Sequence, residues 1–215
     1  MVLGPLLAHF GIVPPIAGFV LFAIGGIVSV ITGLVSLVQL VRGRRLTMGG
    51  GLGVLAGLAF FAIASQGSGY PRINDFTTDP ADPPAFGHAT TLPANAGRNM
   101  SYPAEFAAVQ RECCADLHPA KVRAAPQEAY ARALALARAT PSWTVTHEDP
   151  TGLAIEAVVT SKLFRFQDDV AIRVRPEPDG TSRVDIRSKS RVGKGDIGAN
   201  TTRIRAFVAA LEATK

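Results

Sequence analysis

Two long apolar runs lie near the start of the chain. From Met1 to Val41 there is no Lys, Arg, Asp or Glu, and residues 16–41 are almost all apolar or small. At helical rise this run can cross a hydrocarbon core of about 30 Å with some tilt, and the shorter run 48–65 is marginally sufficient. The pattern predicts a transmembrane helical hairpin over residues 1–66, with spans at about 16–41 and 48–65.

The turn between the spans, residues 42–47, carries three of the chain's 22 basic residues, Arg42, Arg44 and Arg45. The positive-inside rule places such a turn in the cytoplasm and both termini outside. Residues 1–15 lack the basic start and cleavage site of a signal peptide, so both spans are expected to be retained. We therefore predict a membrane protein whose residues 67–215 form an extracytoplasmic α+β domain.

Small residues recur along both spans, where they allow helices to approach closely. They support either packing within the hairpin or a homodimer through the same faces. No charged residue lies inside a span, which argues against an ion path or a transporter. The small residues are Gly26, Ser29, Gly33 and Ser36 on the first span, and Gly49, Gly53 and Gly57 on the second.

After the two spans the spacing of apolar residues along the sequence changes. Residues 66–100 are rich in Pro, Gly, Thr and Asp, and composition alone predicts a spacer. Helical spacing follows Pro103, continues over 126–139 and returns over 196–213. Four runs with strand-like alternation lie between, at 142–148, 152–161, 166–176 and 182–191, without helices separating them. The fold class is thus α+β, with an antiparallel sheet of about four strands packed against two or three helices.

Alternation gives the predicted sheet one apolar and one charged face, provided that no bulge shifts the register between Phe166 and Val170. The charged face has two interpretations: a solvated surface with cross-strand ion pairs, or a basic platform for anionic headgroups or envelope polymers. It carries Glu156, Asp169, Arg173, Arg175, Arg183, Asp185, Arg187, Lys189 and Arg191.

The segment GKGDIG spells G-x-G-x-x-G after the last strand. A dinucleotide fingerprint requires a buried parallel strand before it and a further strand after its helix, and the chain has neither. A kinase-type loop fails for lack of the remaining elements. The segment is better explained as a tight strand exit at Gly193 and Gly195 with Asp196 capping the last helix. An anion site beside Arg191 and Lys194 is the alternative, which the Asp196 carboxylate opposes.

Other chemistry is sparse. Asp168 and Asp169 should point to opposite faces, and Asp168 on the apolar side needs a partner among Arg165, Arg203, Ser188 and Ser190. A buried Asp–Arg network is the preferred interpretation over a metal or catalytic carboxylate. The histidines have no ligand spacing, so neither a metal nor a cofactor is predicted. The vicinal pair Cys113 and Cys114 is expected to be small buried thiols.

Three separated motifs resemble a known family: YPRINDFTTDPADPPAF, IEAVVTSKLFRFQDDVAIRVRP and VDIRSKSRVGKGDIGANTTRIRAF. In this order they are similar to the bacterial and plastid family called domain of unknown function 1499. The resemblance implies that INDFTTD belongs to the folded domain, and it implies no established reaction. For a bacterial member with these spans it implies a location in the bacterial inner (plasma) membrane, with the C-terminal domain periplasmic or extracytoplasmic. Motif positions would include Thr78, Asp79, Pro83, Pro84, Glu156, Phe166, Asp168, Asp169, Arg173, Asp185, Arg187, Ser188, Ser190, Arg191, Gly193, Asp196, Gly198, Asn200 and Arg203.

Three functional hypotheses follow. The leading one is a membrane-anchored domain that binds an anionic envelope component or a protein partner. The second is a hydrolase acting on an envelope substrate, and the third is a structural subunit of a membrane complex. Nucleic acid is not predicted, because part of the basic excess lies in the cytoplasmic turn. The candidate ligand-binding residues are Asp168, Asp185, Arg187, Ser188, Ser190, Arg191, Asp196, Asn200 and Arg203.

Overall fold

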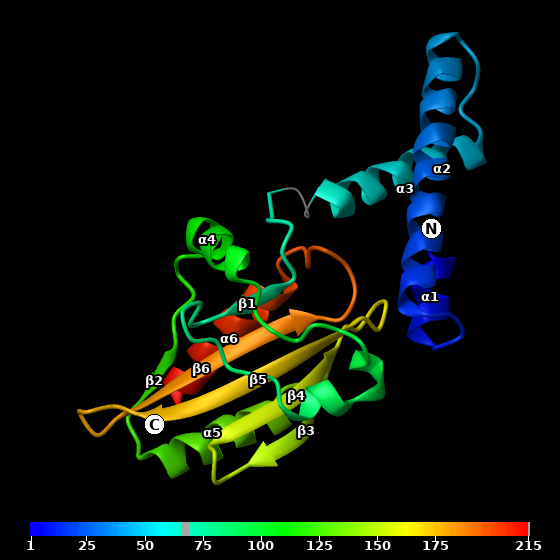
Figure 1. Cartoon of the computed structure of the whole chain (residues 1–215). Coiled ribbons are helices and arrows are strands. Elements are labelled where there is room, and N and C mark those ends of the chain that lie inside the picture. The colour runs from blue at the N-terminus through cyan, green and yellow to red at the C-terminus, as the bar shows by residue number, and fades with distance from the viewer. Residues whose placement is uncertain (66–68, 215) are drawn as a thin grey trace. The chain divides into compact units, whose positions relative to one another are not determined.

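The computed structural model describes residues 1–65 and 69–214 (Figure 1). Two compact units make up the described chain, and each is considered by itself. One contains the N-terminal residues up to Gly69 together with the segment 161–166, and the other contains the remaining residues.

The N-terminal unit is a helical hairpin. Helix α1 (Leu3–His9) was not predicted, whereas α2 (Pro15–Val41) and α3 (Met48–Ser65) coincide with the two apolar runs and are long and apolar enough to cross a membrane. The glycines lie where the two helices approach each other: a Cβ added to Gly33 would lie 3.0 Å from Val54 Cα, and one added to Gly57 would lie 3.1 Å from Val30 Cα. The small residues therefore serve packing within the hairpin, and homodimerisation stays a prediction.

The C-terminal unit is an α+β domain around one antiparallel sheet. The four predicted strands are β3 (Trp143–Asp149), β4 (Ala154–Thr160), β5 (Gln167–Pro176) and β6 (Ser182–Ser190), and they follow one another as a meander. Two short strands, β1 (Asp75–Thr77) and β2 (Ala120–Val122), both pair with the free edge of β6. They lie one after the other along that edge. The expected α+β class is confirmed, with six strands instead of about four.

Register decides which side chains share a face. Pairing of β4 with β5 runs without interruption from Thr160↔Gln167 to Ala154↔Arg173, so no bulge disturbs the start of β5. The one irregularity in the pairing of β3 with β4 lies between Val145 and His147. The predicted division into an apolar and a charged face therefore holds.

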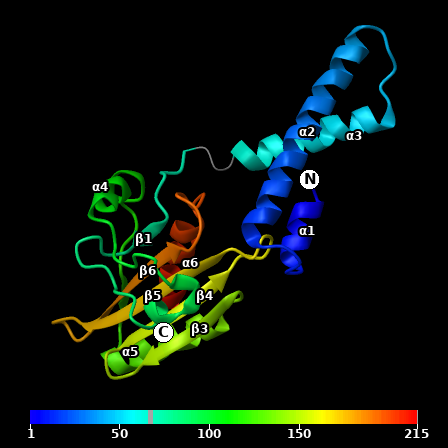
Figure 2. The same ribbon diagram turned by 45° about the vertical axis from the view of Figure 1, so that its right-hand side comes forward.

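Helices α5 (Pro126–Ala139) and α6 (Ala199–Ala213) cover the apolar face (Figures 1 and 2). Their alanine, valine and leucine side chains bury the inward residues of the central strands, including Ile155, Ile172 and Ile186, as one core. Trp143 stacks on Phe207 of α6, with ring centroids 5.3 Å apart. Helix α4 (Ala104–Cys113) is fixed to β1 instead, because Gln110 exchanges two hydrogen bonds with the backbone of Thr77.

The charged face is covered, so neither a solvated surface nor an open basic platform is present. The predicted cross-strand ion pairs are confirmed, since Arg173 pairs with Asp185 opposite it on β6. The segment between β1 and α4, with the short 3₁₀ turns η1 (His88–Thr91) and η2 (Pro93–Asn95), crosses this face (Figure 1). It adds a small second core in which Phe86, Ala89 and Met100 pack against Ala171. The prediction of a spacer from composition is wrong for this segment, because the segment packs on the sheet through polar and charged contacts, which a hydropathy pattern does not reveal.

Candidate functional site

Five of the predicted site residues form one closed network between β5, β6 and α6. Asn200 accepts hydrogen bonds from Ser188 Oγ and Arg203 Nη1, each at 2.6 Å, and donates to Ser190 Oγ at 2.9 Å. Arg203 also donates to Ser188 at 2.7 Å and to Asp168 at 2.6 Å, so the predicted Asp–Arg pair is present. Asn200 and Ser188 are fully buried. The network fixes α6 on the sheet and leaves its polar groups engaged with one another.

Asp196 acts as the helix cap that was predicted. Its carboxylate accepts the N–H groups of Asn200 at 2.6 Å and Gly198 at 3.1 Å. Helix α6 itself begins at Ala199, three residues later than expected, because Ile197 and Gly198 have positive φ. Burial raises the pKa of Asp196, against the opposing effect of these two N–H groups. The carboxylate occupies the helix start, which leaves no anion site there.

The opposite face holds two buried ion-pair clusters. They lie under residues 78–103, which connect β1 to α4 and which we call the covering segment. In the first, the Asp75 carboxylate accepts two hydrogen bonds from Arg187, at 2.9 and 2.7 Å, and one from Lys189 at 2.9 Å. In the second, Asp169 receives Arg191 at 2.6 Å and lies 3.5 Å from Arg98. Four cations thus share two carboxylates. The clusters join the strands to the segment, because Arg98 comes from it and Arg187 also donates to its carbonyl groups.

Two further contacts fasten this segment. Glu156 on β4 is buried and accepts three backbone N–H groups at the start of η1, from Gly87, His88 and Ala89, at 2.6 to 2.9 Å. Near the β5–β6 turn, Asp185 is buried among Arg173, Arg175 and Arg183. The same arginines also bind Asp79 and Asp82 of the segment. Asp185 is therefore a structural anchor in an arginine cluster.

A cavity of about 400 Å³ lies between the covering segment and the sheet. Its one lining residue from the sheet is Arg187, which is 2 % exposed. The Arg187 guanidinium carbon lies 4.7 Å from the ring centroid of Phe86 and 5.5 Å from that of Tyr102. The other lining residues are Pro83, Ala85, Thr90, Arg98, Asn99, Met100 and Ser101.

Arg187 and Arg98 give this cavity its charge. Arg187 uses four N–H groups, two on Asp75 and one each on the carbonyl groups of Pro84 and Met100. A guanidinium has five, so one N–H has no partner among the described residues. Burial and then the charge of Asp75 raise the pKa of Tyr102 to about 12, so its phenol stays protonated at neutral pH. The cavity combines aromatic walls with donors and can hold an anionic group attached to an apolar body.

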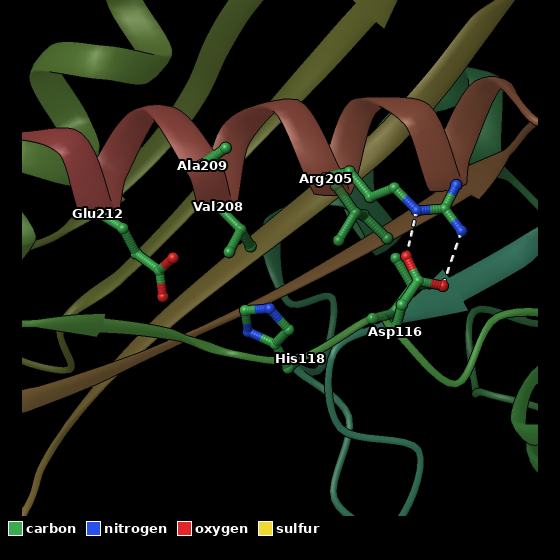
Figure 3. A pocket seen from close by; sticks show the side chains of 8 residues that line it. Asp116, His118, Arg205, Val208, Ala209 and Glu212 are labelled. Atoms are coloured by element: carbon green, nitrogen blue, oxygen red, sulfur yellow. Dashed lines mark hydrogen bonds and ion pairs between the residues drawn. The ribbon is translucent and has the colours of Figure 1, made fainter.

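A second cavity, of about 240 Å³, lies between α6 and the segment leading to β2 (Figure 3). Arg205 closes one side by a bidentate pair with Asp116, at 2.6 and 2.9 Å, which lowers the pKa of that carboxyl. Figure 3 shows the His118 ring between Asp116 and Glu212 without an ion pair drawn to it. Within residues 1–65 and 69–214 no three His, Cys, Asp or Glu side chains gather as a metal site.

Cys113 and Cys114 are joined as a vicinal disulfide, so the expectation of two thiols is wrong. Cys113 ends α4 and is exposed, whereas Cys114 is buried. Neither lines the Arg187 cavity.

The structure thus separates the predicted site residues into two groups on opposite faces of the sheet. Ser188, Ser190, Asn200, Arg203 and Asp168 stay together under α6, with Asp196 at the helix start. Asp185, Arg187 and Arg191 lie on the other face in three different ion-pair clusters. The partners that complete the cavity are Phe86, Arg98, Met100 and Tyr102, which come from a region that composition assigned to a spacer or its edge.

These features define a class: an α+β domain whose antiparallel sheet carries helices on one face and an irregular, ion-paired segment on the other. A family model described as "Protein of unknown function (DUF1499)" matches residues 75–211, which is more than half of the chain, and the chain belongs to this family. The resemblance of the three motifs is thereby confirmed, including the inclusion of the segment after Asp75 in the folded domain. No curated protein matches the chain.

Proposed function

We propose that this protein is a membrane-anchored binding domain that captures a small anionic ligand, or the anionic end group of an envelope component, in the Arg187 cavity. The observation that carries the proposal is the buried Arg187 guanidinium, which lines a cavity of about 400 Å³ beside Phe86 and Tyr102. Ligand sites are typically mostly apolar hollows of this size with a few convergent polar groups.

Charge supports an anion over a cation. Two arginines, Arg98 and Arg187, line the cavity, and no Asp or Glu among the described residues does. Arg187 itself is buried, and an anion bound next to its guanidinium offsets part of the cost of burying that charge. A planar guanidinium next to an aromatic ring also suits carboxylates and phosphates.

A hydrolase finds less support. Its candidate acids do not share a site: Asp168 pairs with Arg203 under α6, Asp196 caps that helix, and Asp185 lies on the other face among arginines. Hydrolysis by a pair of carboxyl groups needs both of them within reach of one bond of the substrate. Binding therefore accounts for more of the geometry than hydrolysis does.

The location of the domain also belongs to the proposal. Two helices of sufficient length and a turn bearing Arg42, Arg44 and Arg45 favour a plasma-membrane anchor with the domain on the periplasmic side. Alkaline phosphatase, which is active only outside the cytoplasm, is expected to be active when fused after Lys215 and inactive when fused after Arg45. The reverse result would contradict this orientation.

Binding is tested by isothermal titration of the full-length protein in detergent with phenyl phosphate, an anion on an aromatic ring. Benzyl alcohol, which lacks the charge, is the ligand control. We expect saturable binding of phenyl phosphate that Ser101→Phe abolishes by filling the cavity from its exposed wall, while Ser101→Ala retains it. Arg98→Gln should weaken binding about tenfold or more, as loss of a charged hydrogen bond does.

Arg123→Gln provides the matched control, since Arg123 is exposed and does not line the cavity. Equal affinity for phenyl phosphate in wild type and Ser101→Phe would overturn the assignment of the cavity. Equal affinity for benzyl alcohol would overturn the anionic character of the ligand.

A further inference from the structure

The second cavity, of about 240 Å³, has an apolar floor and a polar rim (Figure 3). Leu117, Ile204 and Val208 are buried and form its floor, whereas the polar residues that line it are exposed. Liquid water occupies about 30 Å³ per molecule, so the cavity can hold a body of roughly eight non-hydrogen atoms. The residues of the polar rim are Asp116, His118, Arg205 and Glu212.

Two of the rim residues satisfy each other. Arg205 donates from Nε and Nη2 to the two carboxylate oxygens of Asp116, at 2.6 and 2.9 Å. Such a bidentate pair compensates both charges and fixes both side chains. The pair therefore closes one end of the cavity and adds no net charge to it.

Glu212 carries a charge that is not compensated. Its carboxylate accepts one hydrogen bond, from the backbone N–H of Lys121 at 3.1 Å, and no cation pairs with it among residues 1–65 and 69–214. The Lys121 ammonium group binds Asp179 instead, at 2.5 Å. One oxygen of Glu212 thus has no partner in the part of the chain that the structure describes.

The position of Glu212 in α6 makes this charge unfavourable. The helix ends at Ala213, and its last turn contains no basic residue. The carbonyl groups at a helix C-terminus leave about half of a negative elementary charge, which repels a carboxylate and attracts a cation. A cation bound beside Glu212 would offset both charges.

His118 adds a second acceptor. Its Nδ1 lies 3.1 Å from the carbonyl oxygen of Pro119, and because a carbonyl only accepts, Nδ1 carries the proton. In the neutral ring Nε2 is then an acceptor. Figure 3 shows that the Glu212 carboxylate comes from α6 and the His118 ring from the segment leading to β2, and that both point into the space between these two elements.

This set of groups selects the kind of ligand. An anion would meet the Glu212 carboxylate and the helix end, which repel it. A metal ion needs more ligands, and no three His, Cys, Asp or Glu side chains gather as a metal site within the described chain. A primary ammonium group has three N–H donors, which match a carboxylate oxygen and an imidazole nitrogen and leave one for water. The apolar floor suits a carbon body attached to that group.

We propose that this cavity binds a small primary amine. The ammonium group binds Glu212 and His118, and the compact apolar body packs on Leu117, Ile204 and Val208. The cavity shares no lining residue with the Arg187 cavity and selects the opposite charge. The proposal therefore does not depend on the function proposed above.

The test is isothermal titration of the full-length protein, in an uncharged detergent at pH 8, with three ligands that share one apolar body. Cyclohexylamine is a cation at this pH, because alkylamines lose their proton only at about pH 10. Cyclohexanol is the neutral control and cyclohexanecarboxylate is the anionic one. We expect saturable binding of cyclohexylamine and at least about tenfold weaker binding of the other two, as loss of a charged hydrogen bond produces.

A first pair of variants tests the charge. Glu212→Gln keeps an acceptor for the Lys121 N–H and removes the negative charge. It should weaken cyclohexylamine binding about tenfold or more and leave the weak binding of cyclohexanol unchanged. Glu105→Gln is the matched control, since Glu105 is exposed on α4 and does not line the cavity.

A second pair tests the position of the ligand. Ala209→Leu should abolish amine binding by filling the cavity from its exposed wall. Ala210→Leu, at the next exposed position of α6, should retain it because Ala210 does not line the cavity. The emission of Trp143, which stacks on Phe207 of α6, checks that each variant is folded.

Three results would overturn the proposal: equal affinity of the wild type for cyclohexylamine and cyclohexanol, amine binding unchanged in Glu212→Gln, or amine binding unchanged in Ala209→Leu. Nα-acetyl-lysine methylamide distinguishes a free amine from a lysine side chain of a protein partner. If it binds more tightly than cyclohexylamine, the cavity belongs to such a partner and a free amine is not its ligand. Ser101→Phe, which fills the Arg187 cavity, should leave amine binding unchanged, so failure of one site is distinguishable from failure of the other.

Discussion

Removal of one buried amide tests how α6 is held on the sheet. In Asn200→Ala, Ser188 Oγ loses its acceptor and Ser190 Oγ loses its donor, while Arg203 keeps Ser188 and Asp168. Two buried polar groups are thus left unsatisfied, each costing about 1–3 kcal/mol. We expect the free energy of unfolding to fall by about 2–4 kcal/mol, a large part of the stability of an ordinary domain.

The single tryptophan makes the measurement specific. Trp143 lies in the C-terminal domain and stacks on Phe207 of α6, so its emission reports whether the helix and the sheet remain packed. The helical hairpin contains no tryptophan and does not contribute to the signal. In urea titrations of the full-length protein in detergent, the midpoint should fall by about 1–2 M, given an m-value near 2 kcal/mol per M.

Thr202→Ala is the matched control, because Thr202 is exposed on the same turn of α6. It should change the free energy of unfolding by less than about 0.5 kcal/mol. If Asn200→Ala shifts the midpoint no more than Thr202→Ala does, the network does not hold the helix. In that case apolar packing alone would fix α6.

Three more predictions concern the covered face. Asp75→Asn leaves two buried cations without their carboxylate and should cost about 3–5 kcal/mol in the same urea titration; a change below 1 kcal/mol would contradict burial of the pair. Glu156→Gln removes the charge that three N–H groups share and should speed amide exchange at Gly87 to Ala89, and unchanged exchange would refute it. Burial raises the pKa of Asp79, but hydrogen bonds from the Asp82 N–H and from Arg175 outweigh it and hold that pKa below 3.8. Its stabilisation should be present above that pH and lost as pH falls further, so Asp79→Asn should be less stable than wild type at pH 6 and equally stable in strong acid.

Regular periodicity made much of the fold predictable. The apolar runs 16–41 and 48–65 and the helix over 126–139 coincide with observed helices. Alternation placed four strands and assigned their faces, because a side chain's face in a strand depends only on its parity once the register is unbroken. A partner for Asp168 was also predictable from chemistry, since a carboxylate on an apolar face needs one. The structure selects Arg203 from the four candidates.

The covering segment could not be found in this way. Proline, glycine and aspartate over residues 66–100 have no period, and the segment buries few apolar side chains of its own. It is ordered by partners distant in sequence: Glu156 holds η1, Arg187 bonds to Pro84 and Met100, and three arginines bind Asp79 and Asp82. The charged residues on one face of the sheet indicated a solvated surface, but in the structure they bind the covering segment.

Docking of the segment and formation of the cavity are one event. Buried ion pairs are weak contributors to net stability, because desolvation offsets much of their attraction. The pairs under the segment therefore determine where it lies more than how firmly it is held. The same segment supplies Phe86 and Arg98 to the cavity, so a ligand that binds both the segment and Arg187 favours the docked state by mass action. We expect saturating phenyl phosphate to slow amide exchange over residues 85–100 of the wild type and to leave it unchanged in Ser101→Phe. Slowing that is equal in both would show that the effect does not come from this cavity.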